Sequence, residues 1–126
     1  MTSKELISRF KAFAINVALI IKSLPKDSIN VAYSNQLIRS SSSAGANYRA
    51  ACRAKSTADF INKLKIVEEE TDESLYFLEL IEHFNPQLKE QIQPLLKEGN
   101  SLLAIIVKSL ITSKEKLREK LKDIKK

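Results

Sequence analysis

The chain has 126 residues, a formal net charge of +6, two glycines, one cysteine and no tryptophan. A chain of this length buries about two-thirds of its unfolded surface, so it can form one core without disulfides or a structural metal. Scarce glycine with abundant Leu, Ile, Ala, Lys and Glu excludes a turn-rich β fold. We therefore expect one all-α domain over residues 1–126, in which residues 113–126 form a basic helix end or tail.

The apolar run at residues 13–21 raises the question of a signal peptide or a membrane span. It lacks a small-residue cleavage site and continues a helical repeat that begins at Leu6, and a membrane span needs about 20 apolar residues. Cys52 is the single cysteine, so no internal disulfide can form, and its alanine neighbours predict a packed thiol. These features predict a soluble protein of the reducing cytoplasm.

The first predicted helix begins with a capping box, Thr2 followed three residues later by Glu5. Pro25 ends it, because a proline disfavours the helical conformation of the residue before it. Its apolar residues alternate spacings of four and three, and further apolar residues widen this stripe, which predicts a helix that faces two neighbours in a bundle. The residues of the stripe are Leu6, Phe10, Phe13, Val17, Ile20 and Leu24.

The second predicted helix, at about residues 31–53, presents a contact face of small side chains. Small side chains let another backbone approach closely, and a serine within a helix can donate its hydroxyl to a preceding carbonyl. The serines at residues 40–43 could instead form a flexible linker. Ile38 and Tyr48 flank them in register, which favours a packed helix, and the register of Tyr48 favours core packing over base stacking.

The third and fourth predicted helices carry more apolar surface than one core stripe needs. The third begins at Ser56, with Asp59 three residues on, and is apolar on several sides in its last turns. The fourth begins with Asn85 as its cap and Pro86 in its first turn, and Pro94 kinks or restarts it. The excess apolar surface predicts a subunit interface. The candidate interface residues are Tyr76, Phe77, Leu80, Phe84, Leu103, Ile106 and Val107.

Charge is segregated along the chain. Residues 36–65 carry a net +5, residues 66–98 a net −7 and residues 99–126 a net +5. The basic side chains could contact phosphate, or they could be solvated and paired with the carboxylates of the following helix. The candidate nucleic-acid-binding residues are Arg39, Arg49, Arg53, Lys55, Lys116, Arg118, Lys120 and Lys122.

Patterns typical of catalytic sites are missing from the sequence. His83 is the single histidine, which we interpret as a titrating surface residue, and Leu80 stands where a Glu-x-x-His metal motif needs a glutamate. Two glycines cannot build a P-loop or a dinucleotide fingerprint. We therefore predict a protein that is not an enzyme and that binds no metal and no cofactor.

A set of residues spread over most of the chain resembles a known family. These residues are Leu24, Pro25, Lys26, Gln36, Arg39, Ser43, Asn47, Ala54, Ser56, Asp59, Phe60, Glu70, Glu73, Leu78, Glu79 and Leu80. Between residues 10 and 110 the chain resembles the four helix bundle proteins, small bacterial proteins first noticed in intervening sequences within large-subunit ribosomal RNA genes. The chain departs from the family at Phe77, where a tryptophan is common, and at Ala50 and Ala51, which replace a Glu-Gly pair of one branch.

The resemblance implies a left-handed up-down-up-down antiparallel four-helix bundle that assembles into a homo-oligomeric ring, typically a pentamer. The family is similar in fold to the accessory proteins of diversity-generating retroelements, which bind nucleic acid and a reverse transcriptase. The family pattern also places Arg39, Asn47, Glu70 and Glu73 on facing helices. There we expect a buried hydrogen-bonded network that fixes helix register, and the alternative is a ring surface for nucleic acid.

Two hypotheses for the function follow from these patterns. The leading one is a non-enzymatic homo-oligomer that binds structured RNA or DNA, or a nucleoprotein, through the basic half of the second helix and the C-terminal tail. The rival is a protein-interaction scaffold whose charges are solvated or internally paired. A steep salt dependence of nucleic-acid binding would separate the first from the second.

Overall fold

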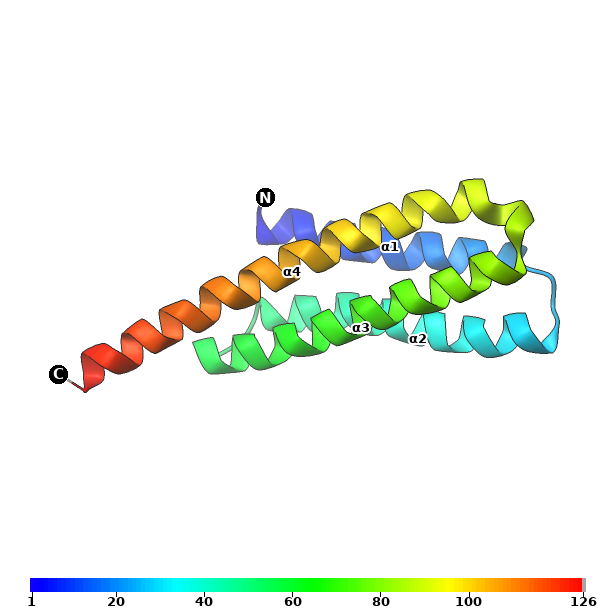
Figure 1. Cartoon of the computed structure of the whole chain (residues 1–126). Helices are drawn as coiled ribbons and strands as arrows, with labels where there is room; N and C mark the ends of the chain where they lie inside the picture. The colour runs from blue at the N-terminus through cyan, green and yellow to red at the C-terminus, as the bar shows by residue number, and fades with distance from the viewer. Residues whose placement is uncertain (126) are drawn as a thin grey trace.

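The computed structural model describes residues 1–125 and contains four α-helices and one 3₁₀ turn within that range. The elements are α1 (Ser3–Ser23), α2 (Ser28–Ala51), α3 (Thr57–Phe84), the 3₁₀ turn η1 (Pro86–Leu88) and α4 (Lys89–Ile124). Each helix reverses the direction of the one before it (Figure 1). The all-α four-helix bundle is therefore confirmed, and its handedness stays a prediction.

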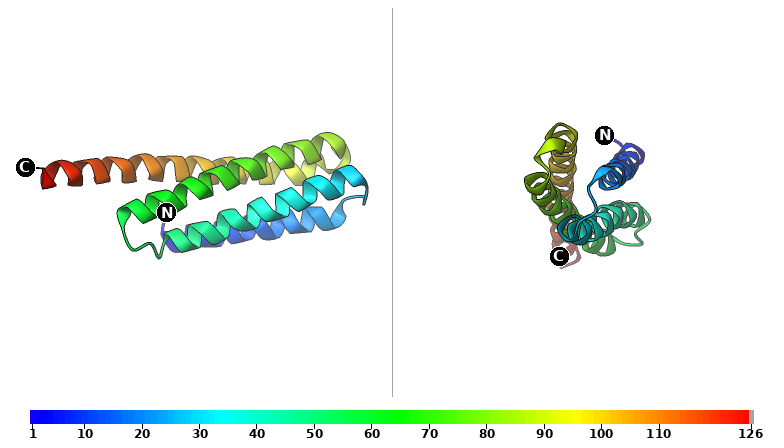
Figure 2. Two further views of the ribbon diagram at one scale, coloured as in Figure 1. Left: turned by 90° about the horizontal axis from the view of Figure 1, so that it is seen from below. Right: turned by 90° about the vertical axis from the view of Figure 1, so that its right-hand side faces the viewer.

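Each helix packs against two neighbours and not against the helix diagonally opposite. Helices α1 and α3 both contact α2 and α4, and the end-on view of Figure 2 shows the four helices arranged around the common axis. The α2–α3 contact is the most extensive and the α1–α4 contact the least. The α1–α2 pair and the α3–α4 pair therefore form opposite sides of the bundle.

Side-chain caps fix the beginnings of the first three helices. The capping box of α1 is confirmed, because the Glu5 amide donates to Thr2 Oγ1 at 3.1 Å and the Thr2 amide donates to the Glu5 carboxylate at 2.9 Å. Helix α2 begins three residues before the predicted start, because the Asp27 carboxylate accepts a hydrogen bond from the amide of Asn30 at 2.8 Å. Ser56 caps α3 as predicted.

Asn85 has a different role from the predicted cap of the fourth helix. Its side chain donates to the Ile81 carbonyl at 2.8 Å and exchanges two hydrogen bonds with the Asn30 amide, at 2.8 and 3.0 Å. Both asparagines are buried. This pair joins the beginning of α2 to the end of α3, so it links the two connections at one end of the bundle.

Of the two alternatives predicted for Pro94, the restart of the fourth helix is wrong, and the kink stays a prediction. Pro86 opens η1, and α4 then runs as one helix from Lys89 to Ile124 with Pro94 inside it. The last turns of α4 extend beyond the α2–α3 connection (Figure 1). Among the described residues, no helix combines the length and apolar character needed to cross a membrane.

One hydrophobic core joins all four helices. Its largest fully buried apolar side chains are Phe10, Phe13, Leu37, Leu64, Leu78, Ile81, Ile92, Leu102 and Ile106. Tyr48 is buried and stacks on Phe10 with ring centroids 5.3 Å apart, so the preference for core packing at Tyr48 is confirmed. Gly99 marks a close approach of α4 to the core, because a Cβ there would lie 2.6 Å from Leu75 Cδ2.

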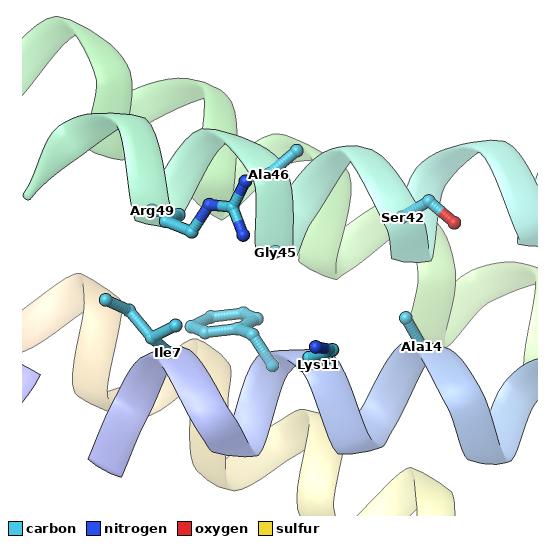
Figure 3. A pocket seen from close by; sticks show the side chains of 8 residues that line it. Ile7, Lys11, Ala14, Ser42, Gly45, Ala46 and Arg49 are labelled. Atoms are coloured by element: carbon cyan, nitrogen blue, oxygen red, sulfur yellow. The ribbon is translucent and has the colours of Figure 1, made fainter. Parts of the chain in front are cut away.

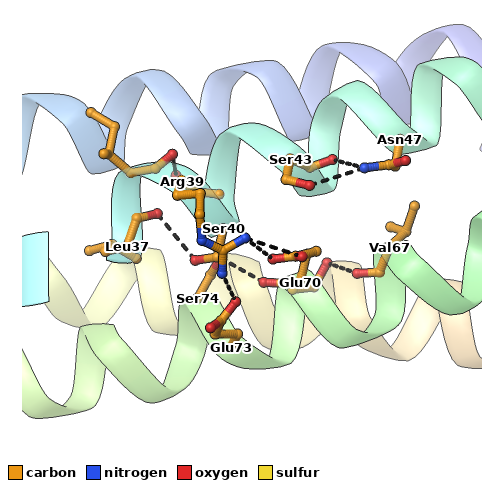
Figure 4. Close-up of polar contacts among 12 residues, drawn as sticks. Leu37, Arg39, Ser40, Ser43, Asn47, Val67, Glu70, Glu73 and Ser74 are labelled. Carbon is orange, nitrogen blue, oxygen red and sulfur yellow. Dashed lines mark hydrogen bonds and ion pairs between the residues drawn. The ribbon is translucent and has the colours of Figure 1, made fainter. Parts of the chain in front are cut away.

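The serine run is part of the packed helix α2, as predicted, and not a linker. Ser40 and Ser41 are fully buried and donate to the carbonyls of Leu37 and Ile38, at 3.2 and 3.4 Å. The Ser40 hydroxyl also lies 2.9 Å from that of Ser74 on α3 (Figure 4). Small side chains thus supply both the close approach of α2 to α3 and the hydrogen bonds inside it.

Two predictions about burial were wrong. Cys52 is exposed, because α2 ends at Ala51 and the chain turns away there. Ile106 is fully buried among the core residues of its own chain, so it offers no surface to a second copy. By contrast, Tyr76 is 57% exposed, and Phe84 and Val107 are also exposed.

Candidate nucleic-acid interface

Arg39 forms ion pairs with two carboxylates of α3. Its guanidinium donates to Glu70 at 3.2 Å and also to Glu73 (Figure 4). The hydrogen bond to Glu73, followed by the one to Glu70, raises the pKa of Arg39 above its ordinary value. The predicted pairing of Arg39 with both glutamates is therefore confirmed, and this cation is occupied within the chain.

The predicted burial of that network was wrong. The Arg39 side chain is 49% exposed, so the pair is screened by solvent and adds little to stability. Partial burial, followed by a hydrogen bond that protonated Glu70 donates to the Glu73 carboxylate, raises the pKa of Glu70 despite the guanidinium beside it. Asn47 lies outside the network, because its amide donates to the carbonyl of Ser43 at 2.9 Å (Figure 4).

Arg49 lines a groove of about 310 Å³ between α1 and α2 (Figure 3). Lys11 of α1 and Arg49 of α2 stand on its two sides, and no carboxylate lines it within the described residues. We name it the basic groove. Its lining residues are Ile7, Phe10, Lys11, Ala14, Ser42, Gly45, Ala46 and Arg49.

A second group of cations gathers where α4 passes the α2–α3 connection. Lys55 and Lys116 line a hollow of about 500 Å³, and Lys65, Lys114 and Arg118 line a neighbouring hollow of about 450 Å³ between α3 and α4. Within the described residues, neither hollow is lined by a carboxylate. We name these five residues the basic end. Three of its residues, Lys55, Lys116 and Arg118, are among the eight predicted candidates, and Lys65 and Lys114 are not.

Helical spacing explains how the end of α4 separates its charges. At 3.6 residues per turn, Leu117 and Leu121 continue the buried stripe of α4 beyond Leu110. The flanks of this stripe carry cations, and the opposite face carries carboxylates. The flanking cations are Lys114, Lys116, Arg118 and Lys120, and the carboxylates are Glu115, Glu119 and Asp123. The sequence shows this spacing, but it does not show which helix or loop of the bundle lies beside each flank of α4.

The other basic candidates do not line these hollows. Arg53 follows the end of α2 in the same connection and is exposed, and Lys120 and Lys122 are exposed on the last turns of α4. Lys63, close in sequence to the basic end, is paired with Asp59 at 2.9 Å. That hydrogen bond lowers the pKa of Asp59.

The site offers positive charge and two hollows. Within residues 1–125, no cluster of three or more His, Cys, Asp or Glu side chains is placed to hold a metal ion. His83 is exposed and packs edge-on against Phe84, with ring centroids 5.1 Å apart. An arrangement of this kind can bind an anion by electrostatic attraction and hydrogen bonds.

Comparison with known proteins places the chain in a family. The family model described as 23S rRNA-intervening sequence protein matches residues 4–108. A crystal structure of a protein of unknown function from the S23 ribosomal protein family of Bacteroides thetaiotaomicron VPI-5482 is similar, with a TM-score of 0.78 and 30% identity over 87% of this chain and 98% of that chain. None of the curated proteins matches. The resemblance found in the sequence is thus confirmed, and the chain belongs to the 23S rRNA-intervening sequence protein family.

Proposed function

We propose that this protein is a non-enzymatic, homo-oligomeric helical bundle that binds the phosphate backbone of structured RNA or DNA with its basic end. The observation that carries the proposal is the grouping of five cations from three segments around two neighbouring hollows whose described lining holds no carboxylate. Lysine and arginine contacts to phosphate supply most of the affinity of sequence-tolerant nucleic-acid binding.

The contrast with the other cations supports this choice of site. Arg9 forms an ion pair with Glu98, and Lys63 forms one with Asp59. Arg39 forms ion pairs with both Glu70 and Glu73. No residue of the basic end forms an ion pair within residues 1–125. Lys65 also lines a hollow with three carboxylates, and the charge of Lys55 helps to lower the pKa of Asp59, so Lys114, Lys116 and Arg118 carry the least compensated positive charge of the basic end.

The description of the matched family names 23S rRNA, so a structured RNA hairpin is the first probe to test. Fluorescence anisotropy of the labelled hairpin, and of duplex DNA, would be measured from about 50 to 200 mM salt. We expect binding that weakens steeply with salt. The variant Lys116→Ala/Arg118→Ala should reduce the slope of log affinity against log salt by about two, because two phosphate contacts are lost.

The matched control is Lys89→Ala/Lys97→Ala, which removes the same charge from exposed positions in the first turns of α4. It should leave the slope unchanged. An equal loss in both variants would mean that net charge and not the basic end drives binding. Absence of binding at the lowest salt would reject the proposal and favour a protein-interaction scaffold.

A further inference from the structure

The α1–α2 side of the bundle is basic and apolar. The basic groove lies there, with Lys11 and Arg49 on its two sides (Figure 3). The chain contains no Asp or Glu between Asp27 and Asp59, so the whole of α2 lacks carboxylates. Ile38 is exposed and continues the groove-facing stripe of α2 at helical spacing. This side therefore presents an apolar surface edged by positive charge.

The opposite side, between α3 and α4, is acidic and apolar next to the basic end, with which it shares Lys65. Its hollow is lined by three carboxylates and one cation, Lys65, together with two apolar side chains. We name it the acidic surface. Its lining residues are Lys65, Glu68, Glu69, Asp72, Leu103 and Val107. Tyr76 is exposed one turn beyond Asp72 on the same face of α3 and extends the apolar part of the surface.

The three carboxylates of the acidic surface form no ion pair within residues 1–125. The neighbouring carboxylates of Glu70 and Glu73 face α2 and form ion pairs with Arg39. The basic groove cannot reach the acidic surface of its own chain, because the α1–α2 and α3–α4 pairs lie on opposite sides. Both surfaces are thus left open in the single chain.

We infer that the basic groove receives the acidic surface of a second copy of this chain, head to tail. The charges are complementary, and each surface has an apolar centre for the other to cover. The contact is heterologous, since two different surfaces meet, and it repeats from copy to copy until the assembly closes. The inference rests on the homo-oligomeric part of the proposed function. It also assigns half of the interface to α1 and α2, whereas the sequence pattern predicted an interface on α3 and α4 alone.

Charge reversal on either surface tests the inference. Lys11→Glu/Arg49→Glu makes the groove acidic, and Glu69→Lys/Asp72→Lys makes the acidic surface basic. In sedimentation-equilibrium measurements, each variant alone should have an association constant at least about tenfold lower than that of the wild type, because like charges then meet. An equimolar mixture of the two should recover association between unlike variants, because the acidic groove of one then meets the basic surface of the other, and the basic groove meets the acidic surface.

The control is Lys89→Glu/Lys97→Glu, which lines neither surface and should keep the wild-type mass. Far-ultraviolet circular dichroism would verify that each variant folds. Wild-type mass in both reversal variants, or a mixture that fails to reassociate, would overturn the inference and leave the proposed oligomer intact. A wild-type monomer would overturn both, whereas nucleic-acid binding is judged separately by anisotropy.

Discussion

The middle of the bundle and the basic end differ in how their polar groups are used. In the middle, Ser40 bonds with Ser74, Arg39 pairs with two glutamates, and no buried side-chain nitrogen or oxygen of the described residues lacks a hydrogen-bond partner. At the basic end, Lys116 and its neighbours face hollows without a carboxylate. Polar groups in the middle therefore serve the fold, and those at the basic end are the ones that we propose to bind phosphate.

Breaking the packing of the middle should have the largest effect on stability. In Gly99→Val the Cβ alone would lie 2.6 Å from Leu75 Cδ2 and 3.3 Å from the Phe13 ring, before the two methyl groups are added. We expect the free energy of unfolding to fall by about 3 kcal/mol, because overpacking forces side chains and backbone to shift. Urea denaturation would measure the change.

Gly45→Ala is the matched control for Gly99→Val. A Cβ at this position would meet Phe10 Cβ at 3.5 Å, an ordinary contact. Since alanine favours a helix over glycine, we expect a gain of about 0.5–1 kcal/mol. A Gly99→Val variant as stable as the wild type would show that α4 is not closely packed at this point.

Removing one member of the buried asparagine pair should have the next largest effect. Asn85→Ala leaves the Asn30 side chain without its buried partner, and we expect the free energy of unfolding to fall by about 1–3 kcal/mol. Asn100→Ala is the control, because the Asn100 amide is exposed and bonds to the Leu96 carbonyl of its own helix. Equal urea midpoints for the two variants would contradict a stabilising role for the pair.

The sequence predicted the helices well because their signals are local. Thr2, Ser56 and Pro25 mark helix ends through contacts within a few residues, and the apolar spacing marks the core. The asparagine pair was missed because Asn30 and Asn85 are 55 residues apart and meet only after the chain folds. The apolar run of the fourth helix predicted Ile106 at an interface, since a run alone does not show which face the bundle covers.

The candidate site was predictable in composition and not in grouping. The sequence showed that Arg39, Lys55 and Lys116 are basic, but it could not show that the first faces two carboxylates while the other two share a hollow. That difference depends on which helices are neighbours. Arg39 forms ion pairs within its own chain, whereas Lys55 and Lys116 line a hollow without a carboxylate.

Alkaline pH should weaken the middle of the bundle through Tyr48. Burial, followed by a hydrogen bond with Cys52, raises the pKa of Tyr48 to about 12 from 10.0. The native state then holds a proton that the unfolded state loses, so this contribution to stability is complete below pH 10 and is lost as the pH rises to 12.

Tyr48→Phe has no hydroxyl to ionise and should lose less stability than the wild type in this pH range. All other side chains are the same in both proteins, so the difference between the two urea profiles isolates the Tyr48 hydroxyl. Tyr76→Phe, at an exposed position, should follow the wild-type profile. Parallel profiles for Tyr48→Phe and the wild type would show that the Tyr48 hydroxyl ionises alike in the folded and unfolded chains.

The smallest changes in stability should come from substitutions of single cations. These substitutions test most directly whether the middle of the bundle and the basic end use their cations differently. Arg39→Ala removes an ion pair at the surface between α2 and α3, so we expect a slightly lower urea midpoint and unchanged affinity for the RNA hairpin. Lys116→Ala should keep the wild-type midpoint and weaken hairpin binding, with a salt slope reduced by about one. If Arg39→Ala also weakened binding, the ion pair with Glu70 and Glu73 would open when nucleic acid arrives. The middle of the bundle would then contribute to the binding surface, and the division between the two regions would fail.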